Sequence, residues 1–503
     1  MAVFEDGLVA VIGHRIDGLV KDRYNLPMPK LIAEKKKPSS SKSPNAVQIR
    51  TFRSALGYLD TLKNVERAVR PEVRNGAMGL GRITRLLHAL GNPHRKFRSA
   101  HIAGTKGKGS TAAMLAAMLR GTGVKTGLYT SPHILDVRER IIVDDANISE
   151  SAFTRCVAAA AAAAAKVKQE ATYFEVLTAA AFRYFADEEI DIAVVETGLG
   201  GRLDATNVIT PEVVGITSIS HDHMDILGND YGAIAREKAG IMKANVPVFS
   251  SPQRPNVKEV LENVASSVRA PLRYSNEGVD YSYRFEFSRS HGRHARICLT
   301  TPTSRFEHVH VPLMGEHQAV NCSLALVMLD ALKARGLPID DQRAVAGLSS
   351  VRLQGRMQMI SENPRILVDG AHNAASVDAL MRAIGQNIPY DSMIVIFGCN
   401  KDKDISGMIR RIQVGADKVI FTTVDSPRAA DPAELAAEYV ERSGKMAQVG
   451  RRLEDAMRIA RPAITREDLI CITGSFYLVA EALRKYSKPL QNQTAGQRLA
   501  VHV

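Results

Sequence analysis

The sequence predicts an α/β protein with two domains, each built on a mostly parallel β-sheet. The chain has 503 residues, which is too long for one ordinary hydrophobic core. From about residue 52, short apolar runs alternate with longer stretches that have helical spacing, as in a series of βαβ units. Most of these runs are apolar throughout, which is typical of strands that are covered by helices on both faces of the sheet.

The expected strands are short, and a stretch with helical spacing separates most of them. They cover residues 100–103, 126–130, 190–195, 213–219 and 246–249 in the first part of the chain, and 366–368, 393–397, 419–423 and 469–473 in the second. The unbroken alanine run at 158–165 predicts a helix, because alanine has the highest intrinsic helix propensity. We expect no chemistry from that helix.

One region departs from the βαβ pattern. Polar and apolar residues alternate at 281–287 and again at 306–311, which predicts antiparallel hairpin strands attached to the first sheet. A helix expected at about 319–335 ends the first domain, and a new βαβ series begins at residue 366. We therefore expect a domain boundary near 351–355.

These patterns divide the chain into four segments. Residues 1–50 are basic and predict a flexible extension, because the run at 35–44, rich in Lys, Ser and Pro, cannot bury a core. Residues 51–352 are expected to form the first domain, with a mostly parallel sheet and small antiparallel hairpins. Residues 353–490 are expected to form a Rossmann-like α/β domain, and residues 491–503 a flexible tail.

Composition limits the functional classes. The chain carries 66 Lys and Arg against 53 Asp and Glu, a formal net charge of +13, which favours anionic partners. These basic residues are not interleaved with aromatic residues and Trp is absent, so a platform for stacking nucleic-acid bases is not indicated. No uncharged apolar run is long enough to span a membrane. We expect a cytoplasmic monomer that binds neither nucleic acid nor a membrane.

A glycine-rich loop follows the first expected strand. It reads Gly104-Thr105-Lys106-Gly107-Lys108-Gly109-Ser110 and leads into a helix. The glycines let backbone N–H groups face a phosphate, the helix N-terminus points its positive end at the same anion, and Lys108 can reach the β- and γ-phosphates of a nucleotide. Gly109 stands where such loops usually have the Ser or Thr that holds magnesium, so a metal-binding hydroxyl must come from Ser110 or from elsewhere.

Further strand ends bring polar groups to the same sheet edge, because the carboxyl ends of parallel strands meet there. The next three expected strands lead to Ser131, to Glu196 and to His221-Asp222-His223. Magnesium prefers oxygen ligands, so Glu196 is a natural ligand and a histidine a less usual one. Ser131 could equally cap a helix.

The second domain repeats this arrangement. Its strands lead to Asp369-Gly370-Ala371-His372-Asn373, to Lys401-Asp402-Lys403-Asp404 and to Gly474-Ser475. Each motif taken alone is more typical of a turn or a helix cap. Together, polar groups at the strand ends of two sheets indicate a cleft between the domains.

An ordered set of motifs carries a family resemblance. They are AGTKGKGST at 103–111, TSPH at 130–133, YFE at 173–175, ETGLGGRLDATN at 196–207, DH at 222–223, EKAGI at 237–241, GEHQ at 315–318 with Asn321, GR at 355–356 and DGAHN at 369–373. Over about residues 52–485 the chain resembles the folylpolyglutamate synthase/dihydrofolate synthase family of Mur-ligase-like ATP-dependent ligases. The resemblance implies a P-loop ATPase domain of the Mur-ligase type followed by a Rossmann-like ligase domain.

The resemblance also implies site residues. ATP would be bound by Gly104, Thr105, Gly107, Lys108, Gly109, Ser110, Asn321, Arg356 and Asp369. Two magnesium ions would be held with the help of Ser131, Glu196, His223 and Lys238, which matches a lysine that this family carbamylates. The pterin would be bound by Thr172, Tyr173, Phe174, Glu175, Leu203, Asp204 and Ala205, and the incoming glutamate would lie near His372 and Ser475. Lys108, carbamylated Lys238 and His372 would be catalytic.

The implied reaction is the ATP-dependent addition of L-glutamate to dihydropteroate, to the γ-carboxylate of (tetrahydro)folate polyglutamates, or to both, through an acyl phosphate. The retained pterin-matching segments favour both activities. Two positions depart from the family pattern. Lys106 stands where the family usually has Asn, and Gln354 stands where it usually has Pro before the Gly-Arg pair.

Two other functions stay open at this point. A Mur-type ligase that adds an amino acid to a UDP-sugar carboxylate would share the fold, but the phosphate loop and residues 203–205 resemble the folate branch. A nucleotide-dependent binding protein without ligase activity finds support only in the net charge of +13.

Overall fold

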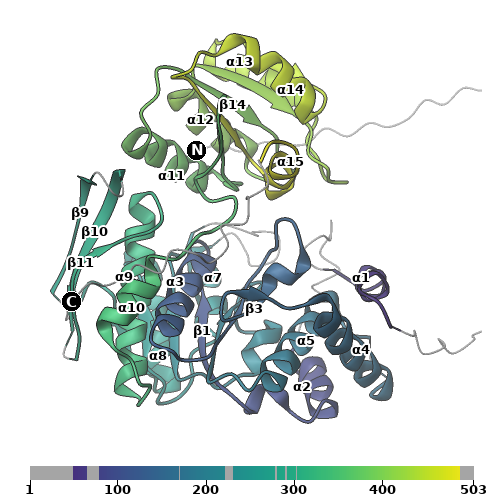
Figure 1. Cartoon of the computed structure of the whole chain (residues 1–503), viewed down its shortest axis with the longest axis vertical. Helices are drawn as coiled ribbons and strands as arrows, with labels where there is room; N and C mark the ends of the chain where they lie inside the picture. The colour runs from purple at the N-terminus through teal and green to yellow at the C-terminus, as the bar shows by residue number, and fades with distance from the viewer. Residues whose placement is uncertain are drawn as a thin grey trace, which may run out of the picture. The chain divides into compact units, whose positions relative to one another are not determined.

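The computed structural model describes residues 49–64, 79–168, 170–220, 230–277, 280–288, 292–301 and 303–487. These residues form an eight-stranded, a three-stranded and a six-stranded sheet, which confirms the α/β class (Figure 1). The predicted extension at 1–50 lies outside the described residues except for Ile49 and Arg50, and the predicted tail at 491–503 and the predicted metal ligand His223 lie wholly outside them.

The largest sheet has the strand order β4-β3-β2-β5-β1-β6-β7-β8. Its strands are β1 (Arg98–Ala103), β2 (Thr126–Tyr129), β3 (Ile141–Val143), β4 (Ala146–Asn147), β5 (Ile192–Glu196), β6 (Val213–Ile216), β7 (Val248–Ser250) and β8 (Leu272–Tyr274). Six neighbouring strands run parallel, and β3 and β4 form an antiparallel edge. Each apolar run predicted in this part of the chain overlaps one of these strands.

Helices cover both faces of this sheet. They are α1 (Phe52–Asp60), α2 (Leu80–Ala89), α3 (Lys108–Gly121), α4 (Glu150–Lys166), α5 (Tyr173–Asp187), α7 (Tyr231–Ala239), α8 (Pro255–Val268), α9 (Glu316–Ala334) and α10 (Asp341–Leu348). On β5, Ile192 and Val194 belong to the core beneath α3 and α9, whereas Ala193 and Val195 belong to the core beneath α4 and α5. Burial on both faces explains why the strands are apolar throughout. The predicted alanine helix is confirmed as the second half of α4.

The predicted hairpins form a separate sheet of β9 (Asp280–Ser288), β10 (Gly292–Thr300) and β11 (Arg305–His310), so their expected attachment to the first sheet is wrong. Figure 1 shows this sheet beside α9 and α10. Ile297 and Leu299 of β10 share a core with Leu326 and Leu329 of α9. The apolar face of the hairpins is therefore covered by a helix, and edge pairing with the first sheet is not needed to bury it.

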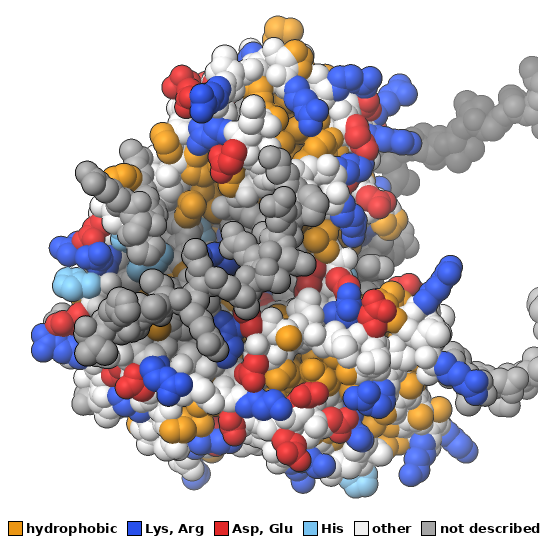
Figure 2. Space-filling model, viewed as in Figure 1, with side chains coloured by type: hydrophobic (Ala, Val, Ile, Leu, Met, Phe, Trp, Pro, Cys, Tyr) orange, Lys and Arg blue, Asp and Glu red, His pale blue; other side chains and the backbone are white. Residues whose placement is uncertain are grey.

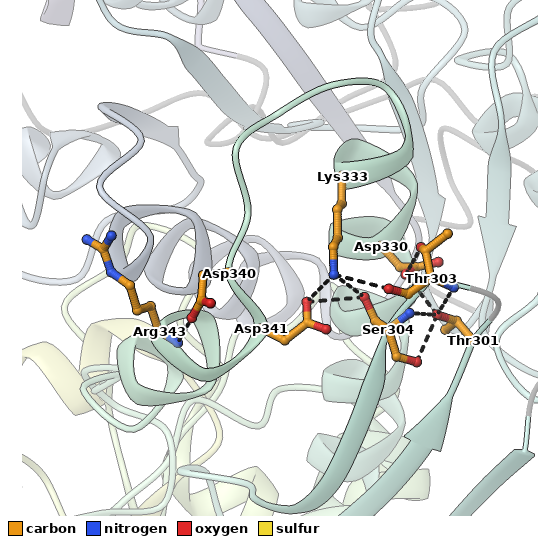
Figure 3. A network of polar contacts seen from close by, with 8 residues as sticks. All are labelled: Thr301, Thr303, Ser304, Asp330, Lys333, Asp340, Asp341 and Arg343. Atoms are coloured by element: carbon orange, nitrogen blue, oxygen red, sulfur yellow. Dashed lines mark hydrogen bonds and ion pairs between the residues drawn. The ribbon is translucent and has the colours of Figure 1, made fainter.

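A polar network fastens the turn between β10 and β11 to α9 and α10 (Figure 3). Lys333 of α9 donates from Nζ to Oδ1 of Asp341 at 2.9 Å and to the carbonyl oxygen of Thr303 at 3.1 Å. The Thr301 hydroxyl donates to Oδ1 of Asp330 at 2.8 Å. These bonds hold the small sheet against the helix that lies next to the phosphate loop.

The six-stranded sheet has the order β12-β13-β17-β14-β15-β16 and is parallel except for the edge strand β12. Its elements are β12 (Gln358–Glu362), β13 (Arg365–Val368), α11 (Ala374–Asn387), β14 (Met393–Phe397), α12 (Ile405–Gly415), β15 (Lys418–Thr422), α13 (Pro432–Ser443), β16 (Gln448–Gly450), α14 (Leu453–Ala460), β17 (Leu469–Thr473) and α15 (Phe476–Tyr486). Helices pack on both faces, in the Rossmann-like arrangement that was predicted. Within the described ranges, no helix is both long and apolar enough to cross a membrane.

Two glycines allow α3 and α10 to cross closely. A Cβ atom added at Gly347 of α10 would collide with the carbonyl oxygen of Ala117 and would lie 2.9 Å from Cα of Gly121, the last residue of α3. Both are backbone atoms, which cannot move aside by rotating a side chain. A side chain at Gly347 therefore forces the helices apart.

We expect Gly347→Ala to lower the free energy of unfolding by about 1–3 kcal/mol, the usual cost of overpacking a close contact. Urea unfolding followed by circular dichroism measures the change. Gly385→Ala is the matched control, because Gly385 lies inside α11 and, apart from its chain neighbours and the backbone of its own helix, no described atom lies within 4 Å of an added Cβ. Alanine there should stabilise the protein by about 0.5–1 kcal/mol. Equal midpoints for the two variants would contradict the close crossing.

Candidate active site

A cleft of about 2550 Å³ is lined by strand ends of both large sheets. One wall comes from the glycine-rich loop, Ser131 and Glu196, and the other comes from Asp369, His372 and Ser475. Within the described residues, all predicted site residues line this cleft except Gly104 and Lys238. The arrangement follows from the topology, because parallel strands end at the same edge of their sheet.

The glycine-rich loop packs too tightly for side chains at two positions. Gly104 has a φ of +148° and an added Cβ would overlap the Thr217 hydroxyl. Gly107 has a φ of +86°, and its Cβ would overlap Oδ1 of Asn321 in the first turns of α9. Helix α3 begins directly after Gly107, at Lys108, so its N-terminal N–H groups point out of the loop into the cleft.

Lys108, at the start of α3, lies close to Glu196, at the end of β5. Lys108 Nζ lies 3.9 Å from Oε1 of Glu196 and donates to the carbonyl oxygen of Thr105 at 3.4 Å. Burial raises the pKa of the Glu196 carboxyl, and the charge of Lys108 opposes that rise. The backbone N–H of Ser131 donates to Oε2 of Glu196 at 3.0 Å. A Cβ at Gly109 would lie 3.3 Å from the same oxygen, so this glycine leaves space beside the carboxylate.

A buried carboxylate next to a hydroxyl-bearing residue fits a hard cation such as magnesium, which takes one or two protein oxygen ligands. Within the described ranges no group of three or more His, Cys, Asp or Glu side chains could hold a metal. Glu196 and Ser131 are therefore the predicted ligands that the structure places together. The buried Lys238 donates from Nζ to the carbonyl oxygen of Gly104 at 2.7 Å, directly beneath the loop.

The predicted pterin segment 172–175 begins α5. Thr172 and Glu175 form a capping box, in which Glu175 N donates to the Thr172 hydroxyl at 3.2 Å and Thr172 N donates to Oε2 of Glu175 at 2.7 Å. The Arg82 side chain also donates to Glu175, at 3.0 Å. This pattern of Thr followed three residues later by Glu was present in the sequence as a capping signal and was missed. Tyr173 and Phe174 lie between the two capping residues and also line the cleft.

The second predicted pterin segment, 203–205, is held by the side chain of its central residue. Asp204 is only 4% exposed, and it caps a short 3-10 turn, η4 (Ala205–Val208). Its carboxylate accepts hydrogen bonds from Leu199 N at 2.9 Å and from Thr206 N at 3.0 Å. Burial raises the pKa of this carboxyl, and hydrogen bonds from Thr206, Leu199 and Gly198 oppose the rise.

Asp369 and Arg356 form part of the opposite wall. The Asp369 carboxylate accepts from Met357 N at 2.9 Å and from Ala371 N at 2.8 Å. The Arg356 guanidinium lies 4.8 Å from the centre of the Phe476 ring. Burial raises the pKa of Asp369, and the charge of Arg356 opposes the rise.

The two residues predicted near glutamate lie on this wall as well. His372 Nδ1 is 2.8 Å from the carbonyl oxygen of Gly370. Because a carbonyl oxygen only accepts, Nδ1 carries a proton in this contact. The Ser475 hydroxyl accepts from Tyr477 N at 3.2 Å and caps α15.

Several cleft residues were given no role by the sequence analysis. His317, in the first turn of α9, lines the cleft, where desolvation by the cleft walls and the charges of Arg356 and Lys106 together lower its pKa to about 4. Asn400 and Arg428 follow β14 and β15 and also line the cleft. Their position in the segments that follow these strands was the available signal, but neither residue lies in a motif that the resemblance used.

Comparison with known proteins agrees with this geometry. Residues 102–329 match the Mur ligase middle domain, and residues 355–476 match the glutamate ligase domain of Mur ligases. The dihydrofolate synthase/folylpolyglutamate synthase of Bacillus subtilis is 33% identical over 423 residues, which cover 81% of this chain and 94% of that protein.

Solved structures show the same likeness. Folylpolyglutamate synthase of Mycobacterium tuberculosis, solved with ADP and AMPPCP, aligns with a TM-score of 0.79 and 31% identity over 88% of this chain and 99% of that chain. A bifunctional folylpolyglutamate synthase/dihydrofolate synthase with Mn, AMPPNP and L-glutamate bound aligns with a TM-score of 0.74 and 28% identity, again over 88% of this chain and 99% of the other. The chain belongs to the folylpolyglutamate synthase/dihydrofolate synthase family of Mur-type ATP-dependent ligases.

Proposed function

We propose that this protein uses ATP to join L-glutamate to dihydropteroate and to the γ-carboxylate of folate polyglutamates. The observation that carries the proposal is one cleft that holds the phosphate loop, a buried carboxylate and the strand-end residues of the second sheet. The relative from Bacillus subtilis bears both activities in its name, and a similar solved structure holds a nucleotide analogue, a divalent metal and glutamate together. We extend those ligand classes to this chain.

ATP would place its phosphates on residues 104–110, with Asn321, Arg356 and Asp369 around the nucleotide. Glu196 and Ser131 would hold magnesium together with His223, and Lys238 in carbamylated form would serve a second ion. Bound magnesium would neutralise charge on the transferred phosphoryl group. Lys238 Nζ already lies against the loop backbone at Gly104, so a carboxylate formed on it would remain close to the phosphates.

The reaction would run in two steps. A carboxylate oxygen of the acceptor attacks the γ-phosphorus of ATP, the bond to ADP breaks, and an acyl phosphate forms. The glutamate amine then attacks the acyl carbon and inorganic phosphate leaves. Lys108 would stabilise the charge that builds up on the phosphoryl oxygens. His372 would accept the proton that the attacking amine loses, through Nε2 when Nδ1 carries the hydrogen bond to Gly370.

The acceptor and glutamate would occupy different parts of the cleft. The pterin would lie against residues 172–175 and 203–205, and glutamate would lie near His372 and Ser475. Acidic and basic side chains interleave on the described surface that Figure 2 shows, which favours small-molecule substrates over nucleic acid. A division into domains at 51–352 and 353–490, a monomeric state and a cytoplasmic location stay predictions.

The whole proposal can be tested with purified protein, ATP, magnesium and L-glutamate. With dihydropteroate or with tetrahydrofolate as acceptor, we expect phosphate release that matches the formation of a new amide, followed by mass spectrometry. A UDP-sugar carboxylate acceptor should give no turnover. Amide formation on that acceptor alone would replace the proposal with a cell-wall type of ligase, and no amide with any acceptor would overturn it.

Lys108→Ala should reduce kcat about 100-fold or more, because the transition state loses a cation that lies at the phosphates. The circular dichroism spectrum should stay that of the wild type. Lys96→Ala is the control, since Lys96 is exposed and does not line the cleft. If Lys108→Ala keeps wild-type turnover, the glycine-rich loop is not the site of phosphoryl transfer.

Glu196→Gln should raise the magnesium concentration needed for half-maximal turnover by about tenfold or more, because the site loses its charged oxygen ligand. Titration with magnesium after removal of metal by EDTA measures this shift. Glu262→Gln removes an exposed carboxylate on α8 and should leave the titration unchanged. An unshifted curve for Glu196→Gln would exclude this carboxylate as a metal ligand.

A further inference from the structure

A buried histidine connects the phosphate-loop strand to the second pterin segment. His101 lies in β1, and the glycine-rich loop begins three residues later at Gly104. The side chain is fully buried, and its Nε2 lies 2.8 Å from the hydroxyl oxygen of Thr206. The Thr206 hydroxyl lies 2.5 Å from Oδ1 of Asp204, which lines the cleft. A chain of three side chains therefore runs from β1 to the cleft surface.

The directions of these hydrogen bonds follow from their donors. The Thr206 hydroxyl donates to Oδ1 of Asp204, and the same carboxylate accepts two backbone N–H groups. A hydroxyl has only one proton, so Thr206 must accept from Nε2–H of His101. Burial lowers the pKa of His101 to about 3, with a further contribution from Lys243, so the ring is neutral and carries one proton. That proton is on Nε2.

Burying this histidine in the core is unfavourable for the free energy of folding. Among the residues that the structure describes, its buried Nδ1 has no hydrogen-bond partner, and neither has the buried hydroxyl oxygen of Thr197, on the neighbouring strand end. A leucine of similar volume would fill the same space without burying polar atoms. The contact that a leucine could not provide is the hydrogen bond from Nε2 to Thr206. This contrast indicates that the bond has a use other than core packing.

We propose that His101 is a positioning residue for the pterin acceptor, because it orients the Thr206 hydroxyl that holds the Asp204 carboxylate at the cleft. The inference rests on the proposed function through the assignment of residues 203–205 to the pterin. In this proposal, β1 helps to position both ATP and the pterin acceptor. The end of the strand carries the loop for the ATP phosphates, and a side chain just before that end aligns the acceptor segment on the neighbouring wall of the cleft.

His101→Leu tests the inference against His101→Gln, whose side-chain amide can place a donor N–H near the position of Nε2. Steady-state kinetics should show that His101→Leu raises KM for dihydropteroate about tenfold, the effect of losing support for a charged hydrogen-bond acceptor. KM for ATP should stay within about twofold of the wild type, and His101→Gln should restore most of the affinity for the acceptor. A purely structural role would move both KM values together and would not distinguish Leu from Gln.

Thr206 provides a second pair that does not depend on the folding of the His101 variants. Thr206→Val removes the hydroxyl and should reproduce the rise in KM for dihydropteroate, whereas Thr206→Ser keeps the hydroxyl and should not. In the double variant His101→Leu/Thr206→Val, the two effects should fail to add, because both act through the same hydrogen bond. Additive effects, or an unchanged KM in Thr206→Val, would overturn the inference.

Thr154→Val is the matched control for loss of a buried hydroxyl. Thr154 donates to the carbonyl oxygen of Glu150 within α4 at 2.6 Å and does not line the cleft. It should leave KM for dihydropteroate unchanged. The proposed function is judged on the wild type alone. If the wild type converts dihydropteroate and His101→Leu and Thr206→Val do so with unaltered KM, the function stands and only the role of His101 fails.

Discussion

The contact between Gly107 and Asn321 is the constraint on which the rest of the site depends. It brings the first turns of α9 against the phosphate loop so closely that no side chain fits at position 107. The left-handed backbone at Gly107 then lets α3 begin at the next residue, with Lys108 beside Glu196. Because the three-stranded sheet packs on α9, the hairpins and the polar network around Lys333 also stabilise this contact, although they lie outside the cleft.

The parallel strands could be predicted because burial on both faces makes them continuous apolar runs. The three-stranded sheet could not be placed in the same way. Alternation at 281–287 indicates that one face is apolar, but it does not say what covers that face, and the cover proved to be α9. Strand β10 escaped notice because two consecutive polar residues, Arg293 and His294, interrupt the alternation in its first half. Short edge strands such as β4 and β16 carry too few residues for a periodic signal.

The candidate site was predictable where it depends on strand ends and on ordered motifs. Glu196 and Ser131 lie together because their strands are neighbours in a parallel sheet. Other contacts join residues that are distant in sequence, such as the bond between Lys238 and Gly104, and no local pattern encodes them. Thr172 and Glu175 illustrate a further limit. Both belong to the resemblance, yet their contacts form a helix cap, which a local capping pattern would have indicated.

The two hydrogen bonds that Asp369 accepts have a mechanical consequence. One comes from Met357, next to Arg356, and the other comes from Ala371, three residues after β13 ends, so the carboxylate joins the segment before β12 to the six-stranded sheet. The hydrogen bond from Gly370 N to Gly355 O, at 2.9 Å, connects the same two segments a second time. These bonds fix the backbone on both sides of Arg356 to the six-stranded sheet. Any displacement of that sheet relative to the glycine-rich loop would carry the guanidinium with it, so the positive charge that Arg356 brings to the cleft would depend on the position of the whole sheet.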